Sequence, residues 1–106
     1  MGLFSNFFGM ADINQGVEEF KNTKGAKLID VRTPQEYNSG HIEDSMNIPL
    51  DRIEMIQNKI KKKDTPLFVH CQSGARSAQA ASYLQQLGYT NVKNIGGIGS
   101  YKGKRV

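Results

Sequence analysis

The chain predicts an α/β fold with a small central parallel sheet flanked by helices on both faces. Short apolar runs alternate with segments whose apolar residues recur at helical spacing, and this alternation is typical of parallel sheets. Its 106 residues are the size of one compact domain. With 38% apolar and 23% charged residues, the composition argues against wholesale disorder. We therefore expect one domain over residues 12–106, preceded by an extension over residues 1–11.

The first helix and strand are expected directly after that extension. Three apolar residues spaced i, i+4, i+7 predict a short amphipathic helix that begins near Asn14. They are Ile13, Val17 and Phe20. The run Lys27–Val31 is short, apolar and followed by polar residues, so it predicts a buried strand.

Three helix-start signals coincide in the next segment. Thr33 can cap a helix, Pro34 suits the first helical turn, and Glu36 completes a capping box. The segment Ser45–Ile48 is a weaker strand candidate, which Pro49 closes. We therefore expect a strand–helix–strand unit here.

A second helical stripe follows Pro49. Its apolar residues recur at spacings of three and four, which predicts a helix with one face buried. They are Leu50, Ile53, Ile56 and Ile60. The basic residues Lys61, Lys62 and Lys63 suit the C-terminal end of such a helix, where the helix dipole favours positive charge.

The last three elements complete the alternation. Pro66–His70 is an apolar run that predicts a strand, and Ser77–Leu87 is expected to be a helix that stops at Gly88. Val92–Ile95 predicts a short final strand before Gly96 and Gly97. The residues of the helix expected to face inward are Ala80, Leu84 and Leu87.

Charge and cysteine content exclude several classes of protein. Fourteen Lys and Arg against ten Asp and Glu give a net charge of +4, concentrated in two clusters with no aromatic-rich stretch beside them. We therefore expect solvated surface there and no nucleic-acid partner. A single cysteine excludes an intrachain disulfide and any multi-cysteine zinc or iron–sulfur site. The clusters are Lys59 with Lys61–Lys63, and Lys102, Lys104 and Arg105.

The segment Met1–Met10 is a poor targeting signal. It has no Lys or Arg before a short, interrupted apolar part, and Asn6 stands where a myristoylation pattern requires Ser or Thr. Its apolar residues could contact a membrane or a partner, but we expect the segment to fold back on the domain or to fray. No apolar run approaches the roughly 20 residues of a transmembrane helix, so cytoplasmic residence is the default expectation.

The chemistry is expected at Cys71. Ligands of open α/β sheets bind beyond the carboxyl ends of strands, and Cys71 lies between a predicted strand end and a predicted helix start. Inward-pointing backbone N–H groups, the helix dipole and Arg76 would all favour a thiolate there. A lone cysteine is often an inert buried residue. Gly74, Arg76 and Ser77, following at fixed offsets, favour a nucleophile instead.

The sequence here resembles the rhodanese-like domain family. Residues 28–37 (LIDVRTPQEY), 40–42 (GHI) and 47–49 (NIP) resemble the N-terminal signature of that family, and residues 71–77 (CQSGARS) resemble its active-site loop. Gly96 and Gly97 match its C-terminal glycine pair, although Tyr101 stands where many members have Trp. The motifs occur in the family's order over residues 13–101, which is far more specific than any one of them.

This resemblance implies a rhodanese-like fold and a sulfurtransferase with no metal or organic cofactor. Cys71 would carry a persulfide taken from a small anionic donor, thiosulfate or polysulfide, and pass it to a thiophilic acceptor, cyanide or a thiol. Ser77 has two expected roles, a hydrogen bond to the donor and a cap on its helix, and the cap is the preferred one. The residues expected to bind the donor are Gln72, Ser73, Gly74, Ala75, Arg76 and Ser77.

Two alternatives remain open at this point. Some rhodanese-like modules carry persulfide between protein partners, and the basic clusters and the aromatic N-terminus could then form a docking surface. Dual-specificity phosphatases of the cell-cycle type and certain arsenate reductases resemble the same fold. Their loop is one residue longer than the four residues Gln72–Ala75 that separate Cys71 from Arg76 here. The shorter loop suits a sulfur atom better than a tetrahedral phosphate.

The remaining polar residues of the signature have structural interpretations. Asp30, Arg32 and Glu36 are expected to form an ion pair or a cap. His41 is expected to hydrogen-bond backbone in its loop. His70 adjoins Cys71, but successive strand residues point to opposite faces, so it is not expected to be a catalytic base.

Overall fold

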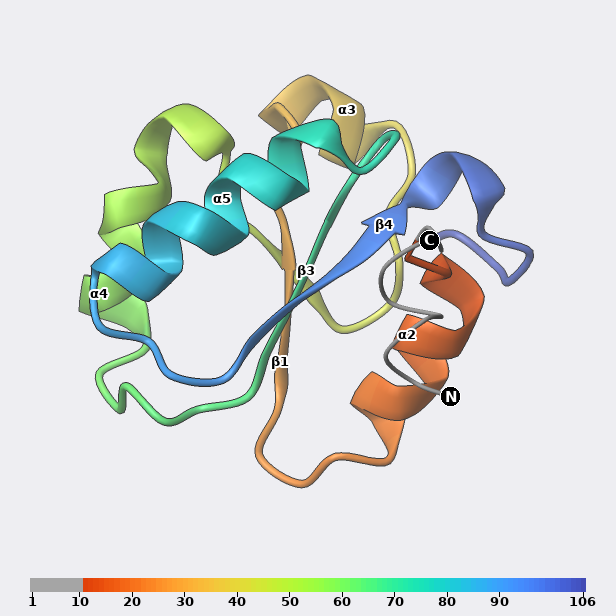
Figure 1. Cartoon of the computed structure of the whole chain (residues 1–106). Coiled ribbons are helices and arrows are strands. Elements are labelled where there is room, and N and C mark those ends of the chain that lie inside the picture. Colours follow the sequence, from red (N-terminus) through yellow and green to blue (C-terminus); the bar gives the residue numbers. More distant parts are fainter. Residues whose placement is uncertain (1–10) are drawn as a thin grey trace.

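The computed structural model describes residues 11–106, so the expectations for residues 1–10 lie outside the described part of the chain. A four-stranded, fully parallel sheet with the order β2-β1-β3-β4 forms the centre (Figure 1). The α/β prediction is confirmed. The strands are β1 (Lys27–Asp30), β2 (Ser45–Asn47), β3 (Leu67–Cys71) and β4 (Val92–Gly97).

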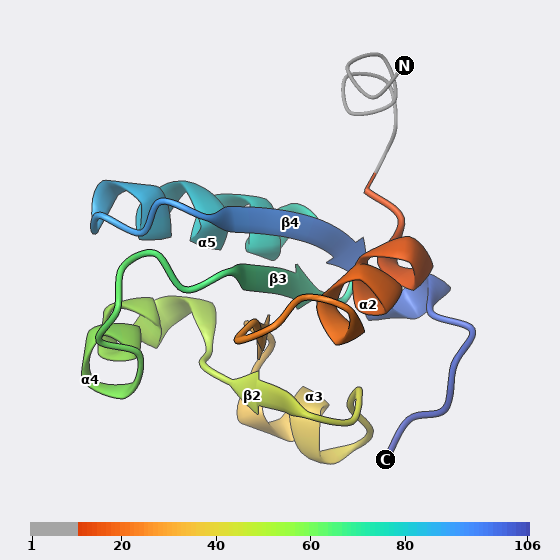
Figure 2. The same ribbon diagram turned by 90° about the horizontal axis from the view of Figure 1, so that it is seen from below.

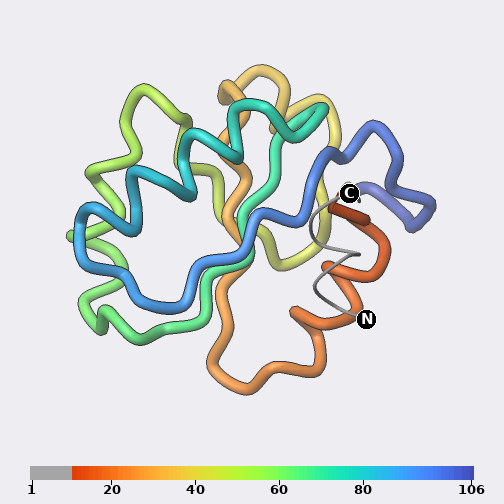
Figure 3. The backbone as a smooth tube through the Cα atoms, in the orientation of Figure 1, coloured from red at the N-terminus to blue at the C-terminus, as the bar shows by residue number. Residues whose placement is uncertain are grey.

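Helical segments connect the strands in chain order, and the tube in Figure 3 follows this alternation. Two of the four predicted helices, those that begin near Asn14 and at Thr33, carry side-chain caps. Asp12 accepts a hydrogen bond from the Asn14 backbone N–H, and Thr33 and Glu36 form the expected capping box. The segments are α2 (Ile13–Lys21), α3 (Pro34–Asn38), the 3₁₀ helix η1 (Leu50–Met55), α4 (Ile56–Lys59), α5 (Ala75–Gln86) and the 3₁₀ helix η2 (Ile98–Ser100).

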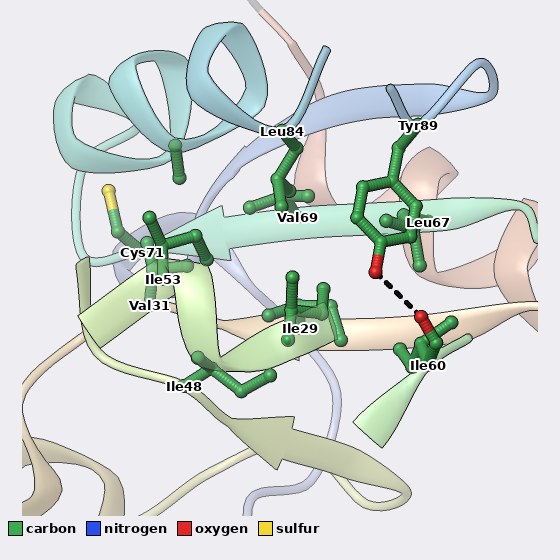
Figure 4. Close-up of a cluster of buried hydrophobic side chains, with 12 residues drawn as sticks. Ile29, Val31, Ile48, Ile53, Ile60, Leu67, Val69, Cys71, Leu84 and Tyr89 are labelled. Carbon is green, nitrogen blue, oxygen red and sulfur yellow. Dashed lines mark hydrogen bonds between the residues drawn. The ribbon is translucent and has the colours of Figure 1, made fainter. Parts of the chain in front are cut away.

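Each face of the sheet buries its own apolar cluster, and the view in Figure 2 separates α2 from α5 and α4 across the sheet. Alternate strand residues supply the two faces, as the pleat requires. Leu28 and Phe68 pack with α2, whereas Ile29 and Val69 pack with α5 and η1 (Figure 4). In the second cluster the Tyr89 hydroxyl donates to the Ile60 carbonyl at 2.6 Å.

The prediction of one continuous α-helix after Pro49 is wrong. It is a 3₁₀ helix whose backbone departs from helical geometry at Arg52 (φ −130°, ψ 24°), followed by the four-residue α4. The spacing of Leu50, Ile53 and Ile56 fits three residues per turn as well as 3.6, so the pattern could not separate the two. Its buried face is as expected, since Ile53 and Ile56 are both buried.

Helix α2 lies close against β4 because of a glycine. A Cβ on Gly16 would overlap the Cβ of Ile95 and lie 2.6 Å from its Cγ2. No helix within residues 11–106 is both long and apolar enough to cross a membrane.

We predict that Gly16→Ala destabilises the domain by about 1–3 kcal/mol, because the added methyl forces helix and strand apart. Urea unfolding would measure this loss. Gln15→Ala, an exposed change in the same helix, is the control and should stay within about 0.5 kcal/mol of the wild type. An equal effect of both changes would show that the close approach is not the cause.

Candidate active site

Cys71 is the last residue of β3, and its side chain points to the sheet face that α5 covers. The residue is 0% exposed, and Figure 4 shows its sulfur beside the loop that leads into α5. The Gly74 backbone N–H donates to Sγ at 3.0 Å, and the Ser77 Oγ lies 3.5 Å from it. The predicted nucleophile therefore lies under its loop, at the carboxyl edge of the sheet.

Hydrogen bonds to sulfur determine the ionisation of this thiol. Burial raises the pKa of Cys71, but donors around the sulfur lower it by more, so that its pKa is below the ordinary value. The donors are the Ser77 hydroxyl and the backbone N–H groups of Ser77, Gly74 and Ser73. Such donors stabilise an anion on sulfur, which makes the thiolate more abundant at neutral pH.

Helix α5 begins two residues earlier than predicted, and this changes the role of Ser77. Gly74 is the residue before the helix, in the left-handed region (φ 104°), and it has no side chain to cap the helix. Ser77 is consequently in the first turn, fully buried, where its Oγ donates toward Asn94 Oδ1 at 2.7 Å. The expectation that Ser77 caps its helix is wrong. Its hydroxyl belongs to the surroundings of the sulfur.

The glycine pair of β4 packs against the loop. A Cβ on Gly97 would overlap the Gln72 carbonyl oxygen and lie 2.6 Å from the Ser73 Cα. The Gly99 N–H donates to that same carbonyl at 3.1 Å. Glycine is required at position 97 because only a residue without a side chain permits this approach.

Arg76 is held by a carboxylate from another helix. Its Nη1 and Nη2 donate to Oε1 and Oε2 of Glu36 at 2.8 and 3.0 Å. This pair and the Thr33 backbone N–H hold the pKa of Glu36 down at about 2. Glu36 had been expected to pair or cap within its own segment. It does cap α3, and it also neutralises the cation of the loop.

The expected ion pair beneath the site is present between Asp30 and Arg32. The Arg32 Nη2 lies 2.8 Å from the Asp30 Oδ2, and the side chains of Arg32 and Asp30 are 2% and 0% exposed. Arg32 also donates to the Gly40 carbonyl at 2.8 Å, and so holds the loop after α3. A buried pair is tolerated when it is hydrogen-bonded in this way.

The two histidines have structural positions. His41 Nδ1 lies 3.0 Å from the Tyr37 carbonyl and its ring stacks on Tyr37, which agrees with the predicted loop contact. His70 is fully buried, and strand alternation places its side chain on the opposite sheet face from Cys71. Its Nε2 lies 3.7 Å from the Asp30 Oδ2.

A cavity of about 700 Å³ lies between the cysteine loop, the end of β4 and the start of α2. Among the residues from 11 onward that line it, Asp12 alone is charged. Asn94, which was not among the predicted site residues, also lines it. The sequence signal for it is an asparagine two residues before the glycine pair. The remaining lining residues are Ala11, Ile13, Gln72, Ser73, Gly74, Gly96, Gly97 and Ser100. Within residues 11–106, no three His, Cys, Asp or Glu side chains gather as metal ligands do.

The fold is a parallel α/β sheet, and a buried thiol lies under the loop between Cys71 and Arg76. Comparison with known proteins identifies the family that shares this arrangement. The family model of the rhodanese-like domain matches residues 14–104. The chain belongs to this family.

Relatives and solved structures agree with that assignment. Thiosulfate sulfurtransferase PspE of Escherichia coli is 39% identical over 71 residues, which are 66% of this chain and 68% of PspE. Uncharacterized protein YqhL of Bacillus subtilis is 40% identical over 89 residues, 82% of this chain and 70% of YqhL. A rhodanese with anions from E. coli superposes with a TM-score of 0.71 at 35% identity, covering 76% of this chain and 96% of that one.

We predict that His70 makes the stability of the domain depend on pH. Burial lowers its pKa below 6.5, and this outweighs the opposing effects of Asp30 and of the hydrogen bond to the Cys71 carbonyl. Between the folded and unfolded pKa values only the unfolded chain binds the proton. The free energy of unfolding therefore falls as the pH drops below 6.5.

Chemical denaturation of the wild type and His70→Asn between about pH 7 and pH 5 would measure this dependence. The variant should lose less stability over that range than the wild type. Parallel slopes for the wild type and His70→Asn would contradict the prediction.

Proposed function

We propose that this protein is a sulfurtransferase that moves sulfane sulfur from thiosulfate or polysulfide to cyanide or a thiol through a persulfide on Cys71. The observation that supports it most directly is the convergence of the Gly74 N–H and the Ser77 hydroxyl on the sulfur. Donors arranged in this way stabilise a thiolate before the reaction and a persulfide anion after it. Relatives named sulfurtransferase support the same reaction class.

The cycle conserves electrons. The Cys71 thiolate attacks the outer sulfur of thiosulfate, a new sulfur–sulfur bond forms, and sulfite leaves with the electron pair of the broken bond. Cyanide or a thiolate then attacks the outer sulfur of the persulfide, and the Cys71 thiolate is restored.

The loop supplies the binding groups in this proposal. Gln72, Ser73, Gly74 and Ala75 form the turn over Cys71, and Arg76 attracts the anionic donor with a charge that Glu36 partly neutralises. We expect Arg76 to share its guanidinium between Glu36 and the donor.

A carrier role between protein partners is the second candidate. It is favoured by a putative sulfur carrier protein, YrkF of B. subtilis, which is 31% identical over 83 residues, 74% of this chain and 44% of YrkF. A carrier would turn over thiosulfate slowly until a partner protein is added. The basic cluster Lys61–Lys63 is not a suitable docking site, since it precedes β3 and Cys71 ends that strand. Lys63 also contacts the Leu87 carbonyl at 2.8 Å.

We predict that the wild type gains the mass of one sulfur atom after exposure to thiosulfate, and that Cys71→Ser does not. Cyanide should remove that sulfur and release thiocyanate. Intact-mass spectrometry of the reduced protein measures the first step and a colorimetric assay the second. A wild type that gains no sulfur from thiosulfate or polysulfide but hydrolyses an aryl phosphate would overturn the proposal in favour of a phosphatase.

We predict that Glu36→Gln lowers the KM for thiosulfate about three- to fivefold, because a neutral amide leaves the charge of Arg76 unpaired. A glutamine at position 36 can still complete the capping box of α3. Steady-state kinetics at low ionic strength would measure the change, with Glu18→Gln in α2 as an exposed control. A raised KM would instead mean that Glu36 holds Arg76 in its productive position.

A further inference from the structure

The Ser77 hydroxyl lies among several acceptors but has one proton to donate. Its Oγ lies 2.7 Å from the Asn94 Oδ1, 3.1 Å from the Gly74 carbonyl oxygen and 3.5 Å from the Cys71 Sγ. The shortest of these distances is to Asn94, so this amide is the nearest acceptor for the hydroxyl proton, while the sulfur lies within reach of the same hydroxyl.

Two other hydrogen bonds determine the orientation of the Asn94 amide. Its Oδ1 accepts from the Gly96 backbone N–H at 3.0 Å, and its Nδ2 donates to the Gly74 carbonyl at 3.4 Å. A flipped amide would place an NH₂ group against the Gly96 N–H, which is unfavourable. Oδ1 therefore faces Ser77 as an acceptor.

A bulge in β4 places Asn94 at this position. In the pairing with β3, Val69 is opposite Asn94 and His70 is opposite Gly96, so that Ile95 is left out of the register. Gly96 adopts the left-handed region (φ 102°) and completes the turn that Asn94 closes. One irregularity in the strand thus brings together Asn94, the glycine pair and the cysteine loop.

We propose that Asn94 is a positioning residue for the nucleophile: its Oδ1 accepts the hydrogen bond of the Ser77 hydroxyl while Cys71 is a thiol, and the hydroxyl turns that hydrogen bond to the sulfur once the thiol has lost its proton to solvent. The hydroxyl keeps its own proton throughout. The inference rests on the proposed function, since it concerns how the Cys71 nucleophile is activated. Asn94 would act through Ser77. Its Oδ1 and the Cys71 sulfur compete for the hydrogen bond of the same hydroxyl, and this competition sets how readily the thiolate forms.

Because Asn94 and the sulfur compete for the Ser77 hydroxyl, changes at Asn94 and at Ser77 should shift the thiolate population in opposite directions. A purely structural role of Asn94 predicts no such opposition. Removing the Asn94 acceptor leaves the Gly74 carbonyl and the sulfur as acceptors for the Ser77 hydroxyl. A charged thiolate is a stronger acceptor than a neutral carbonyl, so this change should favour the thiolate. Removing the Ser77 hydroxyl should disfavour it. Among the described residues, Arg76 of α5 interacts electrostatically with Cys71, and Glu36 of α3 and Asp30 of β1 act on Arg76; none of them is changed.

The experiment titrates the thiolate of the single cysteine by its ultraviolet absorbance, with Cys71→Ser subtracted as the blank. We expect Asn94→Ala and Asn94→Ser to shift the midpoint down by about half to one pH unit, and Ser77→Ala to shift it up by about one unit. A serine at position 94 can still accept the Gly96 N–H, so it keeps the turn if the alanine variant does not fold. Asn91→Ala, an exposed change before the same strand, should leave the midpoint unchanged.

The double variant decides whether Asn94 acts through Ser77. In the Ser77→Ala background, Asn94→Ser should produce no further shift. The proposal is overturned if the Asn94 variants shift the midpoint upward or not at all, if Ser77→Ala does not raise it, or if Asn94→Ser has its full effect without the Ser77 hydroxyl. The titration needs no sulfur donor, so its result is independent of whether the protein transfers sulfur.

Discussion

The close approach of the β4 glycine pair to the cysteine loop is the constraint on which the site depends. The Gln72 carbonyl and the Ser73 Cα occupy the space that a side chain on Gly97 would fill. This contact holds the loop over Cys71, and the Gly99 N–H adds a hydrogen bond to the same carbonyl. The geometry around the sulfur is therefore set by a strand that is distant from Cys71 in sequence.

Charge near the site is distributed between two pairs with different surroundings. Asp30 and Arg32 form a buried pair that holds the loop after α3 by a bond to Gly40. Glu36 and Arg76 form a pair about one third exposed, which connects α3 to the first turn of α5. The buried pair serves the architecture, whereas the exposed one can respond to an arriving anion because solvent lowers the cost of parting its charges.

Local patterns predicted much of the fold and the place of Cys71 at the end of a strand. Short apolar runs located the strands β1, β3 and β4, the weaker candidate Ser45–Ile48 located β2, and the capping box of Thr33 and Glu36 placed the start of α3. Failures came where a pattern fitted two structures. The stripe after Pro49 suits a 3₁₀ helix as well as an α-helix, and the N-terminal boundary of α5 depends on the backbone of Gly74, which no side-chain pattern reveals.

The sequence by itself determined the class of fold and the family, and it singled out the cysteine that we propose as the nucleophile, because these follow from residue types at short, fixed spacings. The tertiary structure alone decided which groups surround the sulfur. Asn94 reaches Ser77 through a bulge between two strands, and Glu36 reaches Arg76 from a helix 40 residues away. Such contacts depend on strand register and on the packing of helices across a sheet, and neither is encoded at the spacing of a local motif.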